Sequence, residues 1–235
     1  MPTSPPWLTA LRRRLGTVTL ATLGSIVAAQ LVFGIGVNLA GSSVLFDLYA
    51  EGLALSPAAL AAGRVWTLLT YALVHDLADP FHVLFNGLAL FYFMPPFEKR
   101  RTVWPTLRLL LASVACGGLL QMGWQGIAEP FLAAPPAQRT VGISAAVVAF
   151  LAAFGWAQPT ARVQLMFVVP LEARWLAPLG LGVDFLIFVS GRPVAFFAHL
   201  GGYLAAWFLI WGRGDPQFIW RRLRFGRPNR FVVVN

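Results

Sequence analysis

The sequence predicts an all-α membrane protein with six transmembrane helices. Three observations support this fold class: 58% of the 235 residues are hydrophobic, only 11% are charged, and the mean hydropathy is +0.70. Soluble domains average roughly 25% charged residues, so an ordinary soluble domain and a disordered chain are both excluded. At about 20 residues per span plus loops, the chain has room for five to seven spans.

Uncharged runs locate the spans. They are expected within residues 15–37, 82–97, 104–123, 140–156, 163–189 and 192–213. The second is expected to end at Pro95–Pro96, and the fifth is interrupted by Pro170 and by two charged residues. The first outer loop, about 38–81, is too long for a simple connector. Within it, Ser56–Pro57 predicts the start of a short helix over 58–62.

The distribution of charge predicts the orientation. The net charge of +9 arises from 18 Lys and Arg against 9 Asp and Glu. Basic residues gather at 12–14, 99–101, 162, 174 and after the last span, which places both termini in the cytoplasm. The charges lie between apolar runs, so the expected partner is a lipid bilayer and not a nucleic acid. Three segments follow: a basic cytoplasmic N-terminus at 1–14, a membrane domain at 15–212 and a basic cytoplasmic tail at 213–235.

Four polar residues lie near the outer ends of three predicted spans. His82 and Asn86 open the second span. Ser144 and His199 lie roughly 6 and 9 Å below the outer starts of the fourth and sixth spans, at 1.5 Å per residue. Polar groups in hydrocarbon cost free energy unless they have partners. Because these four residues lie at similar depths, we expect them to form one outward-facing polar site.

The residue types in this site suit acyl transfer. A serine hydroxyl becomes a nucleophile when a base removes its proton, and neutral histidine is the usual base, so Ser144 and His199 can form a dyad. His82 and Asn86 share one helix face. With the first backbone N–H groups of the serine helix, they offer donors for an oxyanion. The predicted reaction is hydrolysis of a peptide bond at the outer edge of the membrane.

The same residues, taken in order, resemble the rhomboid intramembrane serine proteases over about residues 60–206. The similar motifs are Arg64-x-Trp66, His82-x-x-x-Asn86, Glu98, Gly142-x-Ser144 and His199-x-Gly201-Gly202. The resemblance implies a six-helix rhomboid-like bundle with a partly embedded first outer loop. It also implies a Ser144–His199 dyad without a catalytic aspartate, and an oxyanion hole of the Ser144 N–H, His82 and Asn86. The remaining motif residues would be structural: Arg64, Trp66, Glu98, Gly142, Gly201 and Gly202.

The expected function is cleavage of single-span or membrane-anchored proteins, in a bacterial inner membrane and without metal or cofactor. An alternative is an inactive rhomboid-like protein that binds membrane clients, because Ala145, Val148 and Met94 depart from the family pattern. A small transporter is a third possibility, based on Asp184, which should otherwise hydrogen-bond within the bundle or face water. Taken singly, Ser144 could be a packing serine and His199 a gating or proton-relay residue. No role is assigned to His75, which is expected in a loop.

Overall fold

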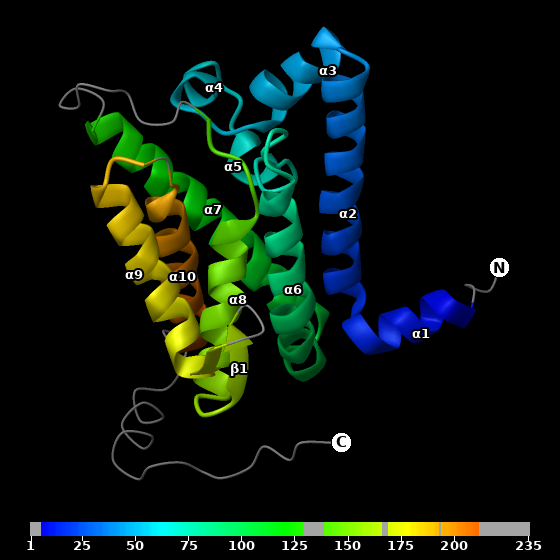
Figure 1. Cartoon of the computed structure of the whole chain (residues 1–235), viewed down its shortest axis with the longest axis vertical. Helices are drawn as coiled ribbons and strands as arrows, with labels where there is room; N and C mark the ends of the chain where they lie inside the picture. Colours follow the sequence, from blue (N-terminus) through cyan, green and yellow to red (C-terminus); the bar gives the residue numbers. More distant parts are fainter. Residues whose placement is uncertain (1–5, 129–138, 166–168, 193, 212–235) are drawn as a thin grey trace.

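The computed structural model describes residues 6–128, 139–165, 169–192 and 194–211, and these are mostly helical (Figure 1). The elements, in chain order, are α1 (Pro6–Leu15), α2 (Thr17–Phe33), the π-helical turn η1 (Gly34–Leu39), α3 (Ser43–Asp47), the π-helical turn η2 (Leu48–Leu53), α4 (Pro57–Ala61), α5 (Thr67–Thr70), α6 (Pro80–Arg101), α7 (Val103–Ala128), α8 (Ser144–Ala157), β1 (Arg162–Leu165), β2 (Val169–Glu172), the 3₁₀ turn η3 (Ala173–Trp175), α9 (Leu176–Val189) and α10 (Phe196–Trp211).

A helix is present in each of the six stretches predicted to span the membrane. The segments Thr17–Leu39 and Val103–Ile127 are long and apolar enough to cross a bilayer by themselves. The others are shorter or carry charges at one end; α8, for example, has 14 residues, or about 21 Å of helix. The helical class is therefore confirmed, while the number of membrane crossings stays a prediction.

Two details of the predicted spans are wrong. The helix expected to end at Pro95–Pro96 continues to Arg101, because an internal proline removes only its own N–H bond and the following turn retains its own. The first part of the fifth stretch is not helical. It forms an antiparallel pair in which Arg162 lies opposite Glu172 and Leu165 opposite Val169, so the fifth helix begins only at Leu176.

The segment between α2 and α6 is built of short helices that pack against the bundle. The predicted helix after Ser56 is confirmed as α4, and the Ser56 hydroxyl caps it by accepting from the Ala59 N–H at 3.1 Å. Leu55 forms an antiparallel bridge with Thr140, just before α8. The Tyr71 hydroxyl donates to the carbonyl of Val114 on α7 at 2.9 Å. This segment is thus joined to α7 and to the residues that lead into α8.

Glycines let the central helices α7, α8 and α10 approach almost backbone to backbone. A Cβ on Gly202 of α10 would overlap the carbonyl oxygen of Ala145 on α8. A Cβ on Gly201 would lie 2.6 Å from the carbonyl oxygen of Cys116 on α7. Small residues at such crossings allow close packing without side-chain interdigitation. The predicted structural role of Gly201 and Gly202 agrees with this geometry, which brings the first turns of α8 and α10 together.

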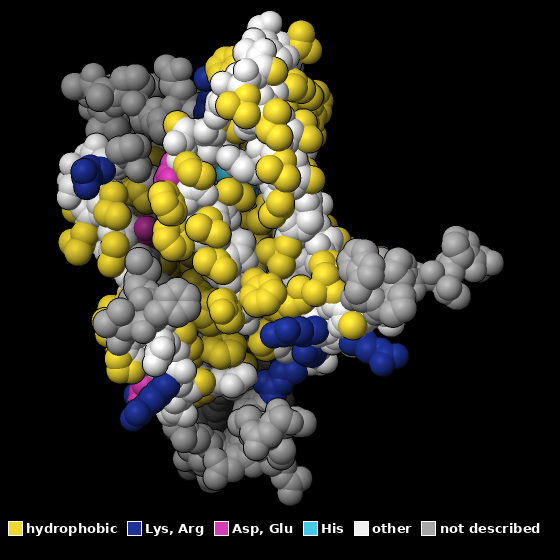
Figure 2. All heavy atoms as spheres, turned by 45° about the vertical axis from the view of Figure 1, so that its right-hand side comes forward, with side chains coloured by type: hydrophobic (Ala, Val, Ile, Leu, Met, Phe, Trp, Pro, Cys, Tyr) yellow, Lys and Arg dark blue, Asp and Glu magenta, His cyan; other side chains and the backbone are white. Residues whose placement is uncertain are grey.

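The outer surface of the bundle is apolar between its two ends. Figure 2 shows hydrophobic side chains over the visible face, with Lys and Arg gathered mainly at the end where α1 lies. On α9, Leu186 and Val189 are 63% and 58% exposed, although both are strongly hydrophobic. Such a large exposed apolar surface is not typical of a soluble monomer, and it suits contact with lipid.

Candidate active site

Ser144 and His199 meet at the same end of the bundle. Ser144 is the first residue of α8, and His199 lies in the first turn of α10. The Oγ atom of Ser144 lies 2.7 Å from Nε2 of His199, and both residues are only partly exposed. If Nε2 carries no proton, it accepts the hydrogen of the hydroxyl. The pair can therefore act as a nucleophile with its base.

The turn that leads into α8 is held by the segment between α5 and α6. Gly142 has φ of +105°, and a Cβ there would lie 2.7 Å from Nε2 of His82, so this position requires glycine. The Gly142 N–H donates to the carbonyl of Tyr71 at 2.9 Å. The next N–H, of Ile143, donates to Nε2 of His75 at 3.4 Å. These bonds determine where the helix, and with it the serine, begins.

His82 and Asn86, the predicted oxyanion donors, lie on α6, which packs against α8. The ring of His82 abuts Gly142, two residues before Ser144. Asn86 is buried, and its Nδ2 has no hydrogen-bond partner among the residues that the structure describes. A buried donor without an acceptor costs free energy in the resting protein. An amide donor of this kind is a group that can bind a negatively charged oxygen.

The structure also brings a carboxylate to His199, a contact that the sequence did not predict. Asp184 on α9 lies with Oδ2 at 2.6 Å from Nδ1 of His199. Of the two placements open for Asp184, within the bundle or facing water, the structure has the first. The sequence located this acid inside an apolar stretch but did not identify its partner. The two residues lie on different helices, and no local spacing relates them.

His75 is a second residue whose position the sequence did not reveal. It was expected to be a loop residue without a role, yet it is 1% exposed and packs edge-on against His82, with ring centroids 5.1 Å apart. Burial, and to a lesser extent the neighbouring His82, lowers the pKa of His75 to about 4. The ring is therefore neutral at pH 7, and its Nε2 can accept from the Ile143 N–H.

Arg64 and Trp66 lie away from the serine, in the segment before α6. Arg64 pairs with Glu51 at 3.3 Å, and the Trp66 indole N–H donates to the carbonyl of Gly52 at 2.8 Å. Arg139, just before α8, pairs with the same Glu51 at 2.7 Å, and this hydrogen bond lowers the pKa of Glu51. Contacts of this kind fold the segment between α2 and α6 on itself and onto the residues before α8. They are consistent with the structural roles predicted for both residues.

Glu98 lies near the opposite end of α6, where it caps another helix. Its carboxylate accepts hydrogen bonds from the N–H groups of Val18 and Thr19, at 2.8 and 2.9 Å, and from the Thr19 hydroxyl, at 2.8 Å. These donors lie in the first turn of α2, which has no side-chain cap from its own N-cap residue. A carboxylate there satisfies orphan donors and complements the helix dipole.

The residues that depart from the family pattern fit their surroundings. The Ala145 side chain is buried, and Gly117 of α7, which faces it, provides room for the methyl group. Val148 and Met94 are buried members of the apolar core. Each is accommodated as a core residue, and their packing does not distinguish an active enzyme from an inactive relative.

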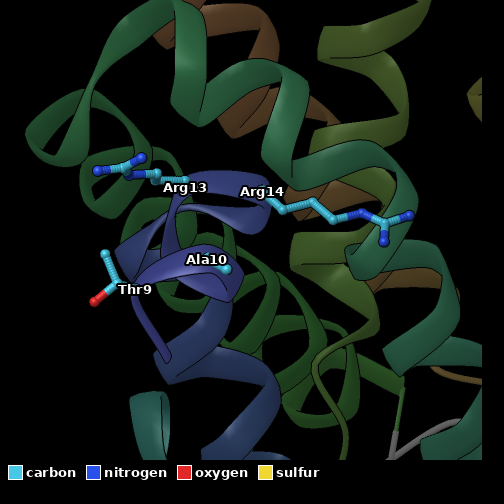
Figure 3. Close-up of a pocket in the computed structure, with 4 residues that line it drawn as sticks. All are labelled: Thr9, Ala10, Arg13 and Arg14. Atoms are coloured by element: carbon cyan, nitrogen blue, oxygen red, sulfur yellow. The ribbon is translucent and has the colours of Figure 1, made fainter. Parts of the chain in front are cut away.

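The described part of the chain also has a hollow that Ser144 and His199 do not line. This hollow on α1 is lined by Thr9, Ala10, Arg13 and Arg14 (Figure 3), at the other end of the molecule from the start of α8 (Figure 1). Its lining offers no arrangement of nucleophile and base. Among the described residues there is also no group of three or more His, Cys, Asp or Glu that could hold a metal ion.

Comparison with known proteins identifies a family for most of the helical bundle. The family model for the Rhomboid domain matches residues 62–215, which include both Ser144 and His199. No curated protein matches the chain. The match covers well over half of the 235 residues, and together with the apolar helices it makes this an integral membrane protein. The chain belongs to the rhomboid family, whose members are usually intramembrane serine proteases.

Proposed function

We propose that the protein is an intramembrane serine endopeptidase that cleaves single-span or otherwise membrane-anchored proteins near the outer face of the membrane. The observation that carries this proposal is the 2.7 Å approach of Nε2 of His199 to Oγ of Ser144. Family membership supports the reaction class. The proposal includes six membrane crossings, with both termini in the cytoplasm, on the basis of the loop charges.

The reaction begins when Nε2 of His199 takes the proton of the Ser144 hydroxyl as Oγ attacks the scissile carbonyl. A C–O bond forms, and the carbonyl oxygen becomes an oxyanion. The N–H of Ser144, the imidazole of His82 and the Nδ2 of Asn86 are the donors proposed for it. The tetrahedral intermediate then collapses, and the C–N bond breaks. His199 returns its proton to the leaving amine, which leaves an acyl-enzyme ester.

Hydrolysis of the ester repeats these steps with water as the nucleophile. His199 takes a proton from the water, the hydroxide attacks the ester carbon, and the proton passes to Oγ of Ser144 as the ester bond breaks. The site lies at the end of the bundle proposed to face outward, where water is available. A substrate helix must unwind locally beforehand, since a helical amide is shielded by its own backbone bonds.

Reaction with a fluorophosphonate probe, together with cleavage of a panel of single-span proteins, tests this function. Wild-type protein is expected to be labelled and to cleave at least one substrate, while Ser144→Ala does neither. A matched control is Ser190→Ala, because Ser190 only donates to the carbonyl of Leu186 at the end of α9. This control should behave like the wild type.

The second candidate is a rhomboid-like protein that binds membrane clients without cutting them, favoured by the unusual Ala145 and Val148. It predicts that neither wild type nor Ser144→Ala reacts with the probe, and that both retain a client equally well. That result would overturn the protease assignment.

A further inference from the structure

Asp184 is an acidic residue in an otherwise apolar helix. It is the only charged residue of α9, and its side chain is 19% exposed, whereas the neighbouring Val183 and Phe185 are 54% and 48% exposed. Asp184 therefore points into the bundle while its neighbours point outward. A lone acid in such a helix costs free energy unless it has a partner.

That partner is the ring nitrogen of His199 that faces away from the serine. Oδ2 of Asp184 lies 2.6 Å from Nδ1, and Nε2 of the same ring lies 2.7 Å from Oγ of Ser144. A carboxylate has no proton to donate, so the hydrogen bond requires a proton on Nδ1. In the neutral ring, Nε2 then carries a lone pair, which is the form that can accept the hydroxyl proton.

We propose that Asp184 is a positioning residue, which turns the Ser144–His199 pair into a triad of side chains from α8, α10 and α9. It holds His199 in the tautomer with the proton on Nδ1 and orients its ring toward Ser144. When Nε2 takes the proton of the hydroxyl, the imidazolium lies beside the Asp184 carboxylate, which stabilises the positive charge. The proton on Nδ1 stays there throughout. This inference rests on the proposed protease function.

The Asp184–His199 hydrogen bond also has a structural effect, which an experiment must separate from the positioning of the ring. It joins α9 to α10, so removal of Asp184 could lower activity simply by loosening the two helices. Another contact between them offers a control, because Phe188 of α9 packs against Phe196 and Phe197 of α10 with ring centroids 5.8 and 5.5 Å apart. Phe188→Leu weakens this packing and removes no atom of the Asp184–His199 hydrogen bond.

The experiment compares Asp184→Asn, Asp184→Glu and Phe188→Leu in the full chain, in detergent micelles. The rate at which the fluorophosphonate probe labels Ser144 is measured first. We expect Asp184→Asn to label roughly 10²-fold more slowly or worse, since an amide is uncharged and can also donate to Nδ1. Asp184→Glu should recover part of the rate because it restores the carboxylate. Phe188→Leu should label at close to the wild-type rate.

A second measurement does not depend on catalysis. The chain has three histidines, so ¹⁵N-histidine NMR, with His199→Gln for assignment, can report which nitrogen of His199 carries the proton. We expect a proton on Nδ1 in wild type, Phe188→Leu and Asp184→Glu, and a mixture or the opposite tautomer in Asp184→Asn.

The outcomes separate the two proposals. If Asp184→Asn keeps the wild-type tautomer and labelling rate, or if Phe188→Leu slows labelling as much as Asp184→Asn does, the positioning role is overturned. If instead the wild type is not labelled at all, the protease function fails. The tautomer measurement then still decides whether Asp184 controls His199.

Discussion

Glu98 and Asp184 are two carboxylates within the bundle, and the contrast between them separates structural from chemical use of the same group. Glu98 is 5% exposed, and its two oxygens accept three hydrogen bonds, two from backbone N–H groups of α2 and one from Thr19. Asp184 is more exposed and bonds to the ring of His199. The first carboxylate satisfies groups that cannot change their protonation, whereas the second bonds to one that can.

This difference predicts unequal effects on stability from the same chemical change. Glu98→Gln keeps the size of the side chain but turns one oxygen into an NH₂ group that faces N–H donors. The free energy of unfolding should fall by about 2–3 kcal/mol because buried donors lose their acceptor. Asp184→Asn should change it by about 1 kcal/mol or less, since the amide can still hydrogen-bond to the ring. Unfolding in mixed micelles by titration with a denaturing detergent measures both.

The control for this pair is Glu172→Gln. Glu172 pairs with Arg174 at the exposed end of the hairpin, and an exposed ion pair contributes about 0.2–1 kcal/mol. Equal losses from Glu98→Gln and Asp184→Asn would contradict the distinction between a capping carboxylate and a positioning one.

The close approach of α8 and α10 provides a second test, because it joins the two halves of the site. Gly202→Ala adds a methyl group where the carbonyl of Ala145 already lies. Overpacking of this kind costs about 1–3 kcal/mol. It should also slow labelling by the probe, since α10 carries His199 and must move away from Ser144. Gly180→Ala on α9 is the control, as a Cβ there meets nothing within 4 Å. A Gly202→Ala protein labelled at the wild-type rate would show that the site does not depend on this contact.

A third test concerns pH and His75. The pKa of His75 is lowered to about 4 in the folded protein, mainly by burial, against about 6.5 when exposed. Between these values the unfolded chain binds more protons than the folded one, so stability falls as the pH falls from 6.5 to 4 and is unaffected by this group above 6.5. The loss is about 3 kcal/mol.

His75→Gln removes this ionisation while an amide oxygen remains to accept from the Ile143 N–H. Unfolding of both proteins is measured at pH 7.5, 5.5 and 4.5. The variant should lose less stability than the wild type between the first and last of these values. Parallel pH profiles would mean that another group causes the acid sensitivity of this end of the molecule.

Much of the site prediction rested on the depth of each residue in the membrane, counted along its predicted span. Ser144 and His199 were placed near one level by counting from the outer ends of their spans, and they lie within hydrogen-bond distance. The same counting could not find Asp184 or His75 as neighbours. Asp184 belongs to a stretch whose first half is a hairpin, so its depth could not be counted from Val163. His75 lies in the segment between α2 and α6, whose path depends on contacts with α7 and with the residues before α8, not on local periodicity.

The sequence by itself determined the class of protein, the places of the helices and the order of the motifs, because hydropathy and spacing act along the chain. Only the tertiary structure decided which polar groups meet. The positions of Gly117, Gly201 and Gly202 determine how closely α7, α8 and α10 pack. That packing brings His199 to Ser144, and α9 places Asp184 at the other nitrogen of the same ring. Hydrogen bonds between helices depend on ångström distances and on ring orientation, and neither quantity is encoded in the spacing of residues along a single helix.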